Sequence, residues 1–352
     1  MVQTEQEHFA RVDAALRAGN GDEFTGAVAR IEHRGRVVFE RAYGVTRDDA
    51  RGRQVYCDTR FDLASLTKLF VATLALQLVA QNRLSLDDPL WTVLPEWKIG
   101  PHVAITARML LAHDSGMNSG ADYRAILDEN VEGFALTTPL LGAPGDRVIY
   151  SDLGFIALGV AIERIAGRSL DALVRAAFGG TVAFRPSSRE RLEIPATEED
   201  SWRGRVQGFV HDEKAYLMGG AAGHAGLFGS AAGVARMAES YLAPFAGRVC
   251  ALLPEPLARE AVSEQAYDPT LRRALGWALK TNDENSCGRW MDEASFGHTG
   301  FVGTCVWADP ARDVSGVLLT NGVYFGREAT PSAERSLRLR FYEAMIEDLS
   351  LR

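Results

Sequence analysis

The chain has 352 residues, of which 47% are hydrophobic and 24% are charged, and these values describe a globular protein of about two domains or lobes. They exclude wholesale disorder, a collagen-like repeat and a small disulfide scaffold. The formal net charge of −8 argues against nucleic acid or an anionic membrane surface as the main partner.

The longest mostly apolar stretch, residues 69–80, is too short to span a bilayer. The N-terminal segment lacks the basic and then apolar regions of a secretory signal. The four cysteines are scattered without a CxxC pair, which favours reduced thiols over a disulfide frame or a zinc site. We therefore expect a soluble, cytoplasmic protein that holds no metal or cofactor. The oligomeric state stays open.

The first half of the chain predicts a hairpin and then a series of helices. Residues 27–33 and 36–43 flank Arg34-Gly35 and form a β-hairpin pattern. Residues 65–81 are apolar nearly all round, which is typical of a helix buried on every side. Residues 153–166 carry apolar side chains on one helical face, and Ser169 is placed to cap the helix that follows.

The second half predicts irregular structure and then strands. Residues 184–215 are rich in charge of both signs, and we expect a long excursion on the surface, over a groove. Residues 219–235 are dense in glycine and alanine and predict a tight loop that enters a helix. Residues 304–308 and 314–321 predict an antiparallel pair of strands, and a closing helix is expected from Thr330 to about residue 346.

Strands at both ends of the chain and helices in the middle predict an α+β fold. The simplest assembly joins the two ends in one antiparallel sheet flanked by helices, with a mainly helical lobe beside it. We expect a discontinuous sheet domain from residues 1–64 and 260–352 and a helical domain from residues 65–259. The active site is expected between the two domains.

A serine and a lysine stand together at the start of the buried helix. Ser65 is placed in its first turn, and Lys68, three residues later, lies on the same face. An amine beside a hydroxyl that must lose its proton is what a serine nucleophile needs. The alternative is a helix cap with a solvated lysine, which the apolar surroundings disfavour. Lysine is otherwise rare in this chain, which uses arginine for most of its positive charge.

Two further polar segments are candidates for the same site. Tyr150 and Asp152 precede an amphipathic helix, where a simple capping role for Ser151 or Asp152 is the alternative. Glycines flank His298 and Thr299 just before a predicted strand. This pattern is typical of a place where a ligand approaches the backbone closely. There the alternative is an ordinary turn with a surface histidine.

These elements, in this order, resemble the serine β-lactamase and penicillin-binding-protein superfamily, in particular its class C branch with D-peptidase and esterase relatives. That family carries Ser-x-x-Lys, then Tyr-x-Asn, then Lys-Thr-Gly. The similarity extends beyond these triplets to five blocks that span most of the chain: FDLASLTKLF (61–70), LLAHDSGM (110–117), VIYSDLGFIALG (148–159), GGAAGHAGLFGSA (219–231) and FGHTGFVGT (296–304).

The resemblance implies a serine hydrolase that works through an acyl-enzyme on a small ester, amide or β-lactam, that is, on a small-molecule or short peptide substrate. Ser65 would be the nucleophile, and Lys68 and Tyr150 would share the proton transfer. Either an ammonium at Lys68 favours the phenolate of Tyr150, or a free amine at Lys68 takes the proton directly. The oxyanion hole would be the backbone N–H groups of Ser65 and Phe301. The substrate-binding residues implied are Asp152, His298, Thr299, Gly300 and, as a lining residue of a nearby loop, His224.

Two positions depart from the family pattern. Asp152 replaces an asparagine, so an N–H₂ donor becomes a carboxylate that only accepts. A carboxylate near Lys68 should keep that lysine protonated, which makes Tyr150 the predicted base. His298 replaces a lysine and is expected to be mostly neutral at pH 7. These changes predict weak turnover of β-lactams compared with small neutral esters or D-amino acid amides.

Several other interpretations remain or are set aside. The alternative function is a penicillin-binding or sensor protein that is acylated without efficient turnover. Residues 113–115 (His-Asp-Ser) carry the letters of a triad, but adjacent residues cannot form its geometry, and we expect a structural block. Residues 211–213 (His-Asp-Glu) could bind a metal, but a solvated loop is the preferred interpretation.

Overall fold

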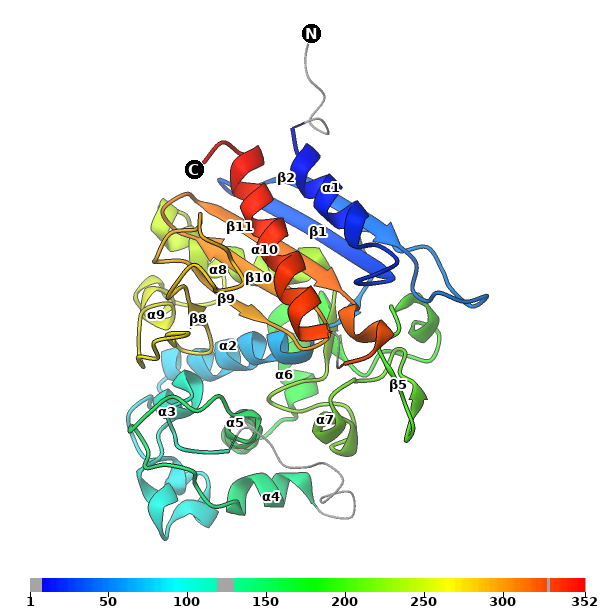
Figure 1. Cartoon of the computed structure of the whole chain (residues 1–352). Coiled ribbons are helices and arrows are strands. Elements are labelled where there is room, and N and C mark those ends of the chain that lie inside the picture. The colour runs from blue at the N-terminus through cyan, green and yellow to red at the C-terminus, as the bar shows by residue number, and fades with distance from the viewer. Residues whose placement is uncertain (1–7, 119–129, 328–329, 352) are drawn as a thin grey trace.

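The computed structural model describes residues 8–118, 130–327 and 330–351. Its centre is a six-stranded antiparallel sheet with the order β2-β1-β11-β10-β9-β8, so strands from the two ends of the chain lie side by side (Figure 1). The predicted hairpin and the predicted pair at 304–308 and 314–321 are both present. The strands are β1 (Gly26–His33), β2 (Arg36–Gly44), β8 (Ala278–Leu279), β9 (Phe296–Thr299), β10 (Cys305–Asp309) and β11 (Val314–Thr320).

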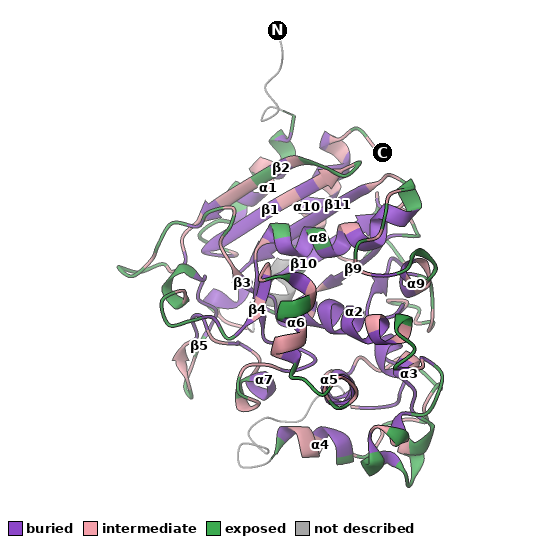
Figure 2. Cartoon of the chain, turned by 180° about the vertical axis from the view of Figure 1, so that it is seen from behind, coloured by how far each residue is buried: buried purple, intermediate pink, exposed green. Residues whose placement is uncertain are grey.

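Helices cover both faces of this sheet. The terminal helices α1 (Ala10–Gly19) and α10 (Thr330–Asp348) lie together on one face (Figure 1). Helix α8 (Ala231–Leu242) packs against β1, β10 and β11 on the other face (Figure 2). Every residue of β11 is therefore buried. The division into a sheet domain (1–64 and 260–352) and a helical domain (65–259) stays a prediction. Helix α8 belongs by sequence to the range predicted as the helical domain, but it packs on the sheet.

The helical part lies beside the sheet and has α2 (Thr67–Ala80) at its centre. Almost all of this helix is buried, as its apolar sequence predicts (Figure 2). Helix α5 (Asp152–Ala166) packs on α2, begins at the cap Ser151 and ends at Gly167. The hydroxyl of Ser169 accepts from the N–H of Ala172 and caps the next helix, as predicted. The other helices are α3 (Ala107–Ala112), α4 (Val131–Thr137), α6 (Leu170–Phe178), α7 (Glu213–Leu217) and α9 (Glu255–Ala261).

Residues 184–215 differ from the surface excursion that we expected. The segment contains buried residues of both polar and apolar type, among them Ile194, Glu198 and His211. Some of its charged side chains, Glu198, Arg203 and Glu213, take part in ion pairs and are largely removed from solvent. Two small sheets organise this region: β3 (Phe61–Asp62) with β7 (Leu227–Gly229) and β4 (Val182–Phe184), and β5 (Glu199–Asp200) with β6 (Gly204–Arg205).

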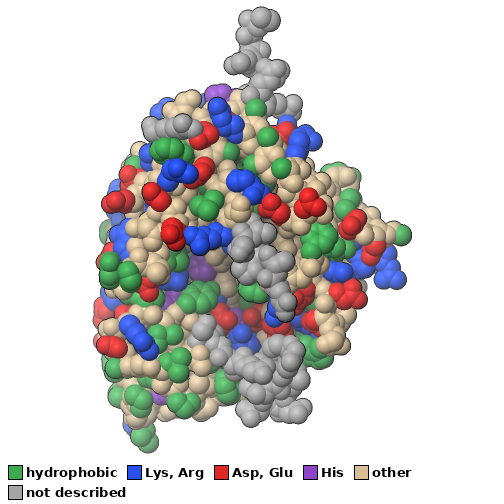
Figure 3. Space-filling view, viewed as in Figure 1, with side chains coloured by type: hydrophobic (Ala, Val, Ile, Leu, Met, Phe, Trp, Pro, Cys, Tyr) green, Lys and Arg blue, Asp and Glu red, His purple; other side chains and the backbone are tan. Residues whose placement is uncertain are grey.

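A cavity of about 710 Å³ opens where the sheet meets the helical part. Figure 3 shows a hollow at mid-height of the molecule, in which a histidine and acidic side chains are visible. Residues from the start of α2, the start of α5 and the end of β9 line it. Among the described residues, none of the helices combines the length and apolar character that a bilayer crossing requires.

Candidate active site

Ser65 and Lys68 meet at the floor of the cavity. A single 3₁₀ turn, residues 64–66, leads into α2 and leaves Ser65 half-buried at the cavity wall. Lys68 is completely buried. Its ammonium donates to Ser65 Oγ at 3.0 Å, to Asp152 Oδ1 at 2.8 Å and to the carbonyl of His224 at 3.3 Å. The three donors of the ammonium are thus matched by three oxygens.

The charge on Lys68 is fixed by its surroundings. Burial alone would lower the pKa of the Lys68 amine, but the carboxylate of Asp152 and the phenol of Tyr150 raise it above its usual range. The same contact lowers the pKa of Asp152 in spite of that group's burial. Lys68 is therefore an ammonium at neutral pH, which is the state that the aspartate in the second motif predicts.

Asp152 is one end of a longer array of charges. Lys214 Nζ lies 3.3 Å from Asp152 Oδ2 and 3.5 Å from Asp212 Oδ2, so one lysine joins two carboxylates. Asp212 in turn lies 2.7 Å from His224 Nε2. The array therefore runs from Lys68 to His224. The backbone carbonyl of His224 accepts a hydrogen bond from Lys68, which closes the array into a ring.

His224 is placed differently from the lining residue that we expected. The side chain is fully buried behind Asp212, and the cavity is lined by its neighbours instead. Ligand atoms of Asp152, Asp212 and His224 lie within 4.8 Å of one another, which is close enough to hold a metal ion. However, the ammonium groups of Lys68 and Lys214 already contact these carboxylates, so lysine supplies the positive charge that a metal would bring.

Tyr150 is held in a sandwich of rings and cations just before α5. The ring stacks on His113 with centroids 4.5 Å apart, and Lys68 Nζ lies 4.8 Å from the centroid of Tyr150. His113 is itself buried, and its Nδ1 accepts a hydrogen bond from the N–H of Ser151. The block at 113–115 is structural, as predicted, and its histidine also positions Tyr150.

The third motif lies on β9 and presents a neutral histidine. Burial and the charges of Lys68 and Arg273 lower the pKa of His298 to about 3. His298 Nδ1 lies 2.8 Å from the carbonyl of Thr299, which can only accept, so Nδ1 carries the proton. In the part of the chain that the structure describes, no donor reaches Nε2. The motif therefore offers a lone pair where a lysine would offer a donor.

The geometry around Gly300 brings the end of β9 against the nucleophile turn. A Cβ on Gly300 would lie 2.8 Å from the carbonyl of Leu63, so only glycine allows this approach. The backbone N–H groups of Ser65 and Phe301 have no acceptor among the described residues, and both residues line the cavity. Two unused donors of this kind suit an oxyanion. The predicted residues that line the cavity are Ser65, Tyr150, Asp152, His298, Thr299, Gly300 and Phe301.

Asp62 is a functional residue that sequence reasoning missed. Its carboxylate is buried and accepts from the N–H of Ala64 at 2.8 Å and from the N–H of His211 at 2.7 Å. Burial raises the pKa of Asp62, which the two hydrogen bonds oppose. Ala64 has a φ of 44°, in the left-handed region that a residue with a side chain rarely adopts. Asp62 therefore holds a strained turn that presents Ser65 to the cavity.

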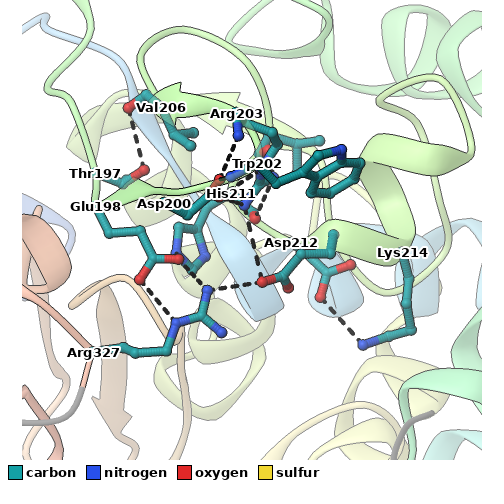
Figure 4. A network of polar contacts seen from close by, with 12 residues as sticks. Thr197, Glu198, Asp200, Trp202, Arg203, Val206, His211, Asp212, Lys214 and Arg327 are labelled. Atoms are coloured by element: carbon teal, nitrogen blue, oxygen red, sulfur yellow. Dashed lines mark hydrogen bonds and ion pairs between the residues drawn. The ribbon is translucent and has the colours of Figure 1, made fainter. Parts of the chain in front are cut away.

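The His-Asp-Glu segment at 211–213 is not the solvated loop that we preferred. Arg327 pairs with Glu198 (Figure 4). It also lies 2.8 Å from a carboxylate oxygen of Glu213. His211 Nε2 lies 3.1 Å from Glu198, and the His211 ring stacks on Phe301 with centroids 5.6 Å apart. Through the stacked ring of His211, these ion pairs connect the wall of the cavity to Phe301. The sequence signal for these ion pairs was the mixture of positive and negative residues in this segment, which we interpreted as a sign of solvent exposure.

The charge array makes a prediction about acid stability. Burial would raise the pKa of Asp212, but the charges of His224 and Lys214 and the hydrogen bond from His224 lower it well below its usual value. A carboxyl whose pKa is lower in the folded state stabilises the fold above its unfolded value, about 3.9, and this contribution is lost as the pH falls below it. Urea unfolding should show less stability from about pH 4 downwards, and Asp212→Asn should flatten that slope by up to about 1.4 kcal/mol per pH unit. Parallel curves for the two proteins would contradict the array.

Comparison with known proteins agrees with this geometry. The Beta-lactamase family model matches residues 12–339. Esterase EstB of Burkholderia gladioli is 32% identical, over 90% of this chain and 91% of its own length. The N-acetylmuramyl-L-alanine amidase of Bacillus subtilis (strain 168) is 29% identical, over 91% of this chain and 82% of its own length.

Solved structures show the same fold. A class C beta lactamase superimposes with a TM-score of 0.78 at 14% identity, over 97% of this chain and 99% of its own. EstCE1, described as a hydrolase with promiscuous acyltransferase activity, superimposes with a TM-score of 0.77 at 20% identity, over 96% of this chain and 99% of its own. With the matched family model and the related esterase, these likenesses identify the chain as a member of the beta-lactamase family and a serine hydrolase of the β-lactamase fold.

Proposed function

We propose that the chain hydrolyses small esters and amides through an acyl-enzyme on Ser65, with Tyr150 as the base. Tyr150 takes the proton of Ser65 as Oγ attacks the carbonyl carbon, and then gives that proton to the departing oxygen or nitrogen. The N–H groups of Ser65 and Phe301 stabilise the oxyanion, each by about 3 kcal/mol. A water molecule then attacks the acyl carbon while Tyr150 takes one of its protons. Tyr150 returns this proton to Ser65 Oγ as the acid leaves.

One observation carries this assignment of roles. Lys68 donates to Ser65 and to Asp152 at the same time, and Asp152 is itself paired with Lys214. An ammonium held by a carboxylate cannot accept a proton, so it serves to orient Ser65 and to stabilise negative charge on Tyr150. The Tyr150 ring lies 4.8 Å from this ammonium, which supports the second role.

Intact-mass spectrometry after a fluorophosphonate pulse tests the proposal. We expect one stable adduct that peptide mapping places on Ser65, and rapid hydrolysis of short-chain p-nitrophenyl esters by the untreated protein. An acyl adduct from a β-lactam that persists for hours, without ester turnover, would instead support the penicillin-binding or sensor alternative. Labelling elsewhere, or none, would contradict both functions.

The relatives' names support both bond types, since one is an esterase and another an amidase. We infer that β-lactams are poor substrates, because Asp152 cannot donate to a substrate carbonyl and His298 presents a lone pair. The kcat/KM for nitrocefin should be at least about tenfold below that for p-nitrophenyl butanoate, the equivalent of one lost hydrogen bond to substrate. A higher value for nitrocefin would contradict this inference.

A further inference from the structure

Lys214 is the second lysine of the active site, and no step of the proposed reaction uses it. The chain has only four lysines, and two of them, Lys68 and Lys214, meet at Asp152. One carboxylate oxygen of Asp152 faces Lys68, and the other lies 3.3 Å from Lys214 Nζ. Lys214 lines the cavity from the short helix α7, whereas Lys68 is fully buried.

Lys214 contacts two carboxylates that lie close together. Oxygen atoms of Asp152 and Asp212 lie within 4.8 Å of each other, and the two side chains are only 18% and 19% exposed. Like charges at this distance in a partly buried site repel each other. Lys214 Nζ also lies 3.5 Å from Asp212 Oδ2 (Figure 4). The adjacent Glu213 has a partner of its own in Arg327, so Lys214 serves the two aspartates.

The charges of these four side chains are in balance. Two ammonium groups, Lys68 and Lys214, face two carboxylates, Asp152 and Asp212. Without Lys214 the array would carry one negative charge in excess. That charge would lie one ion pair away from Ser65, because Lys68 contacts both Asp152 and the nucleophile.

In the proposed reaction, negative charge develops close to this array. It lies on Tyr150 when that residue acts as the base, and then on the carbonyl oxygen as Ser65 attacks. The ammonium of Lys68 supports both states, and an excess negative charge behind Lys68 would weaken that support. A neutral substrate has no charge to interact with the array before it reacts. The effect of the array therefore belongs to the chemical step and not to binding.

We propose that Lys214 is a positioning residue that neutralises Asp152 and Asp212, so that Lys68 can stabilise the negative charge that develops in the reaction. This inference rests on the proposed function and adds a residue to it. The alternative is a structural lysine that only holds α7 in place. The two roles differ in what a second substitution does. A charge imbalance can be repaired at Asp212, whereas a lost structural contact cannot.

Compensating substitutions test the proposal, with p-nitrophenyl butanoate as a neutral substrate. Lys214→Met should lower kcat at least about tenfold and leave KM within about twofold of the parent value. Asp212→Asn, added to Lys214→Met, removes the excess charge and should raise kcat again by at least about fivefold. Lys214→Arg keeps the charge and should keep most of the activity. Lys98→Met, at an exposed lysine, is the matched control and should be silent. EDTA in every assay prevents a metal ion from replacing the ammonium between the carboxylates.

The rate at which a fluorophosphonate labels Ser65 separates this inference from the proposed function. Intact mass follows the labelling, which reports on the nucleophile without any turnover. Labelling that is slower in Lys214→Met and recovers with Asp212→Asn supports the role of Lys214. If the parent protein were labelled in this way but hydrolysed no ester, the proposed function alone would be overturned.

Two results would overturn the inference itself. One is a kcat and a labelling rate in Lys214→Met equal to those of the parent. The other is a double variant, Lys214→Met with Asp212→Asn, that is no faster than Lys214→Met alone, which would show a structural role. A thermal melt of each variant checks that it is folded. If Lys214→Met does not fold, Lys214→Gln with and without Asp212→Asn gives the same comparison.

Discussion

Ser65→Ala is expected to lower ester hydrolysis by roughly 10⁴- to 10⁶-fold, because loss of a nucleophile leaves only binding and oxyanion stabilisation. The fold should survive the change. Lys68 loses one acceptor but keeps Asp152 and the carbonyl of His224. The free energy of unfolding of the variant should therefore lie within about 1 kcal/mol of the parent value. Progress curves with p-nitrophenyl butanoate and a urea titration measure the two effects.

The matched control is Ser263→Ala, an exposed serine near the end of α9. It should retain full activity and accept the fluorophosphonate adduct that Ser65→Ala lacks. Residual turnover by Ser65→Ala within a factor of ten of the parent would show that another group attacks the substrate. The serine assignment would then be wrong, whatever the geometry around Lys68.

Tyr150→Phe is expected to lower kcat/KM by about 10²- to 10⁴-fold, the usual contribution of a general base. The ring is retained, so its stacking on His113 and its contact with Lys68 should persist and the melting temperature should change little. Only the hydroxyl that carries the proton is lost. Steady-state kinetics and a thermal melt separate a chemical defect from a structural one.

The alternative base makes a different prediction for this variant. If Lys68 took the proton as a free amine, removal of a hydroxyl on Tyr150 would cost less than about tenfold, since the amine would remain beside Ser65. Tyr267→Phe, at an exposed tyrosine, controls for the loss of a phenol elsewhere and should be silent. A large defect in Tyr150→Phe together with a silent control supports the ammonium assignment.

Much of the fold could be predicted because its signals are local. The hairpin around Gly35, the apolar run of α2 and the serine caps of α5 and α6 each follow from a few neighbouring residues. The motifs around Ser65, Tyr150 and His298 are short and resemble a known family. They therefore predicted the residues that the structure brings to one cavity.

The missed residues are those whose role depends on partners far along the chain. Lys214 meets Asp152, and Asp62 meets His211, across long loops that no periodicity describes. The charges of residues 184–215 suggested solvent exposure, because a sequence shows the charge but not the counter-ion. The rarity of lysine was a usable signal for Lys214.

The place of β11 in the sheet has a consequence for how the enzyme matures. This strand lies between β1 and β10, so the N-terminal hairpin has no neighbour to join until residues 314–320 have left the ribosome. Closing so long a loop is a slow step that depends on the whole intervening chain. Catalytic competence should thus arise late and all at once, and the first ester turned over during synthesis would mark the moment at which the last strand takes its place.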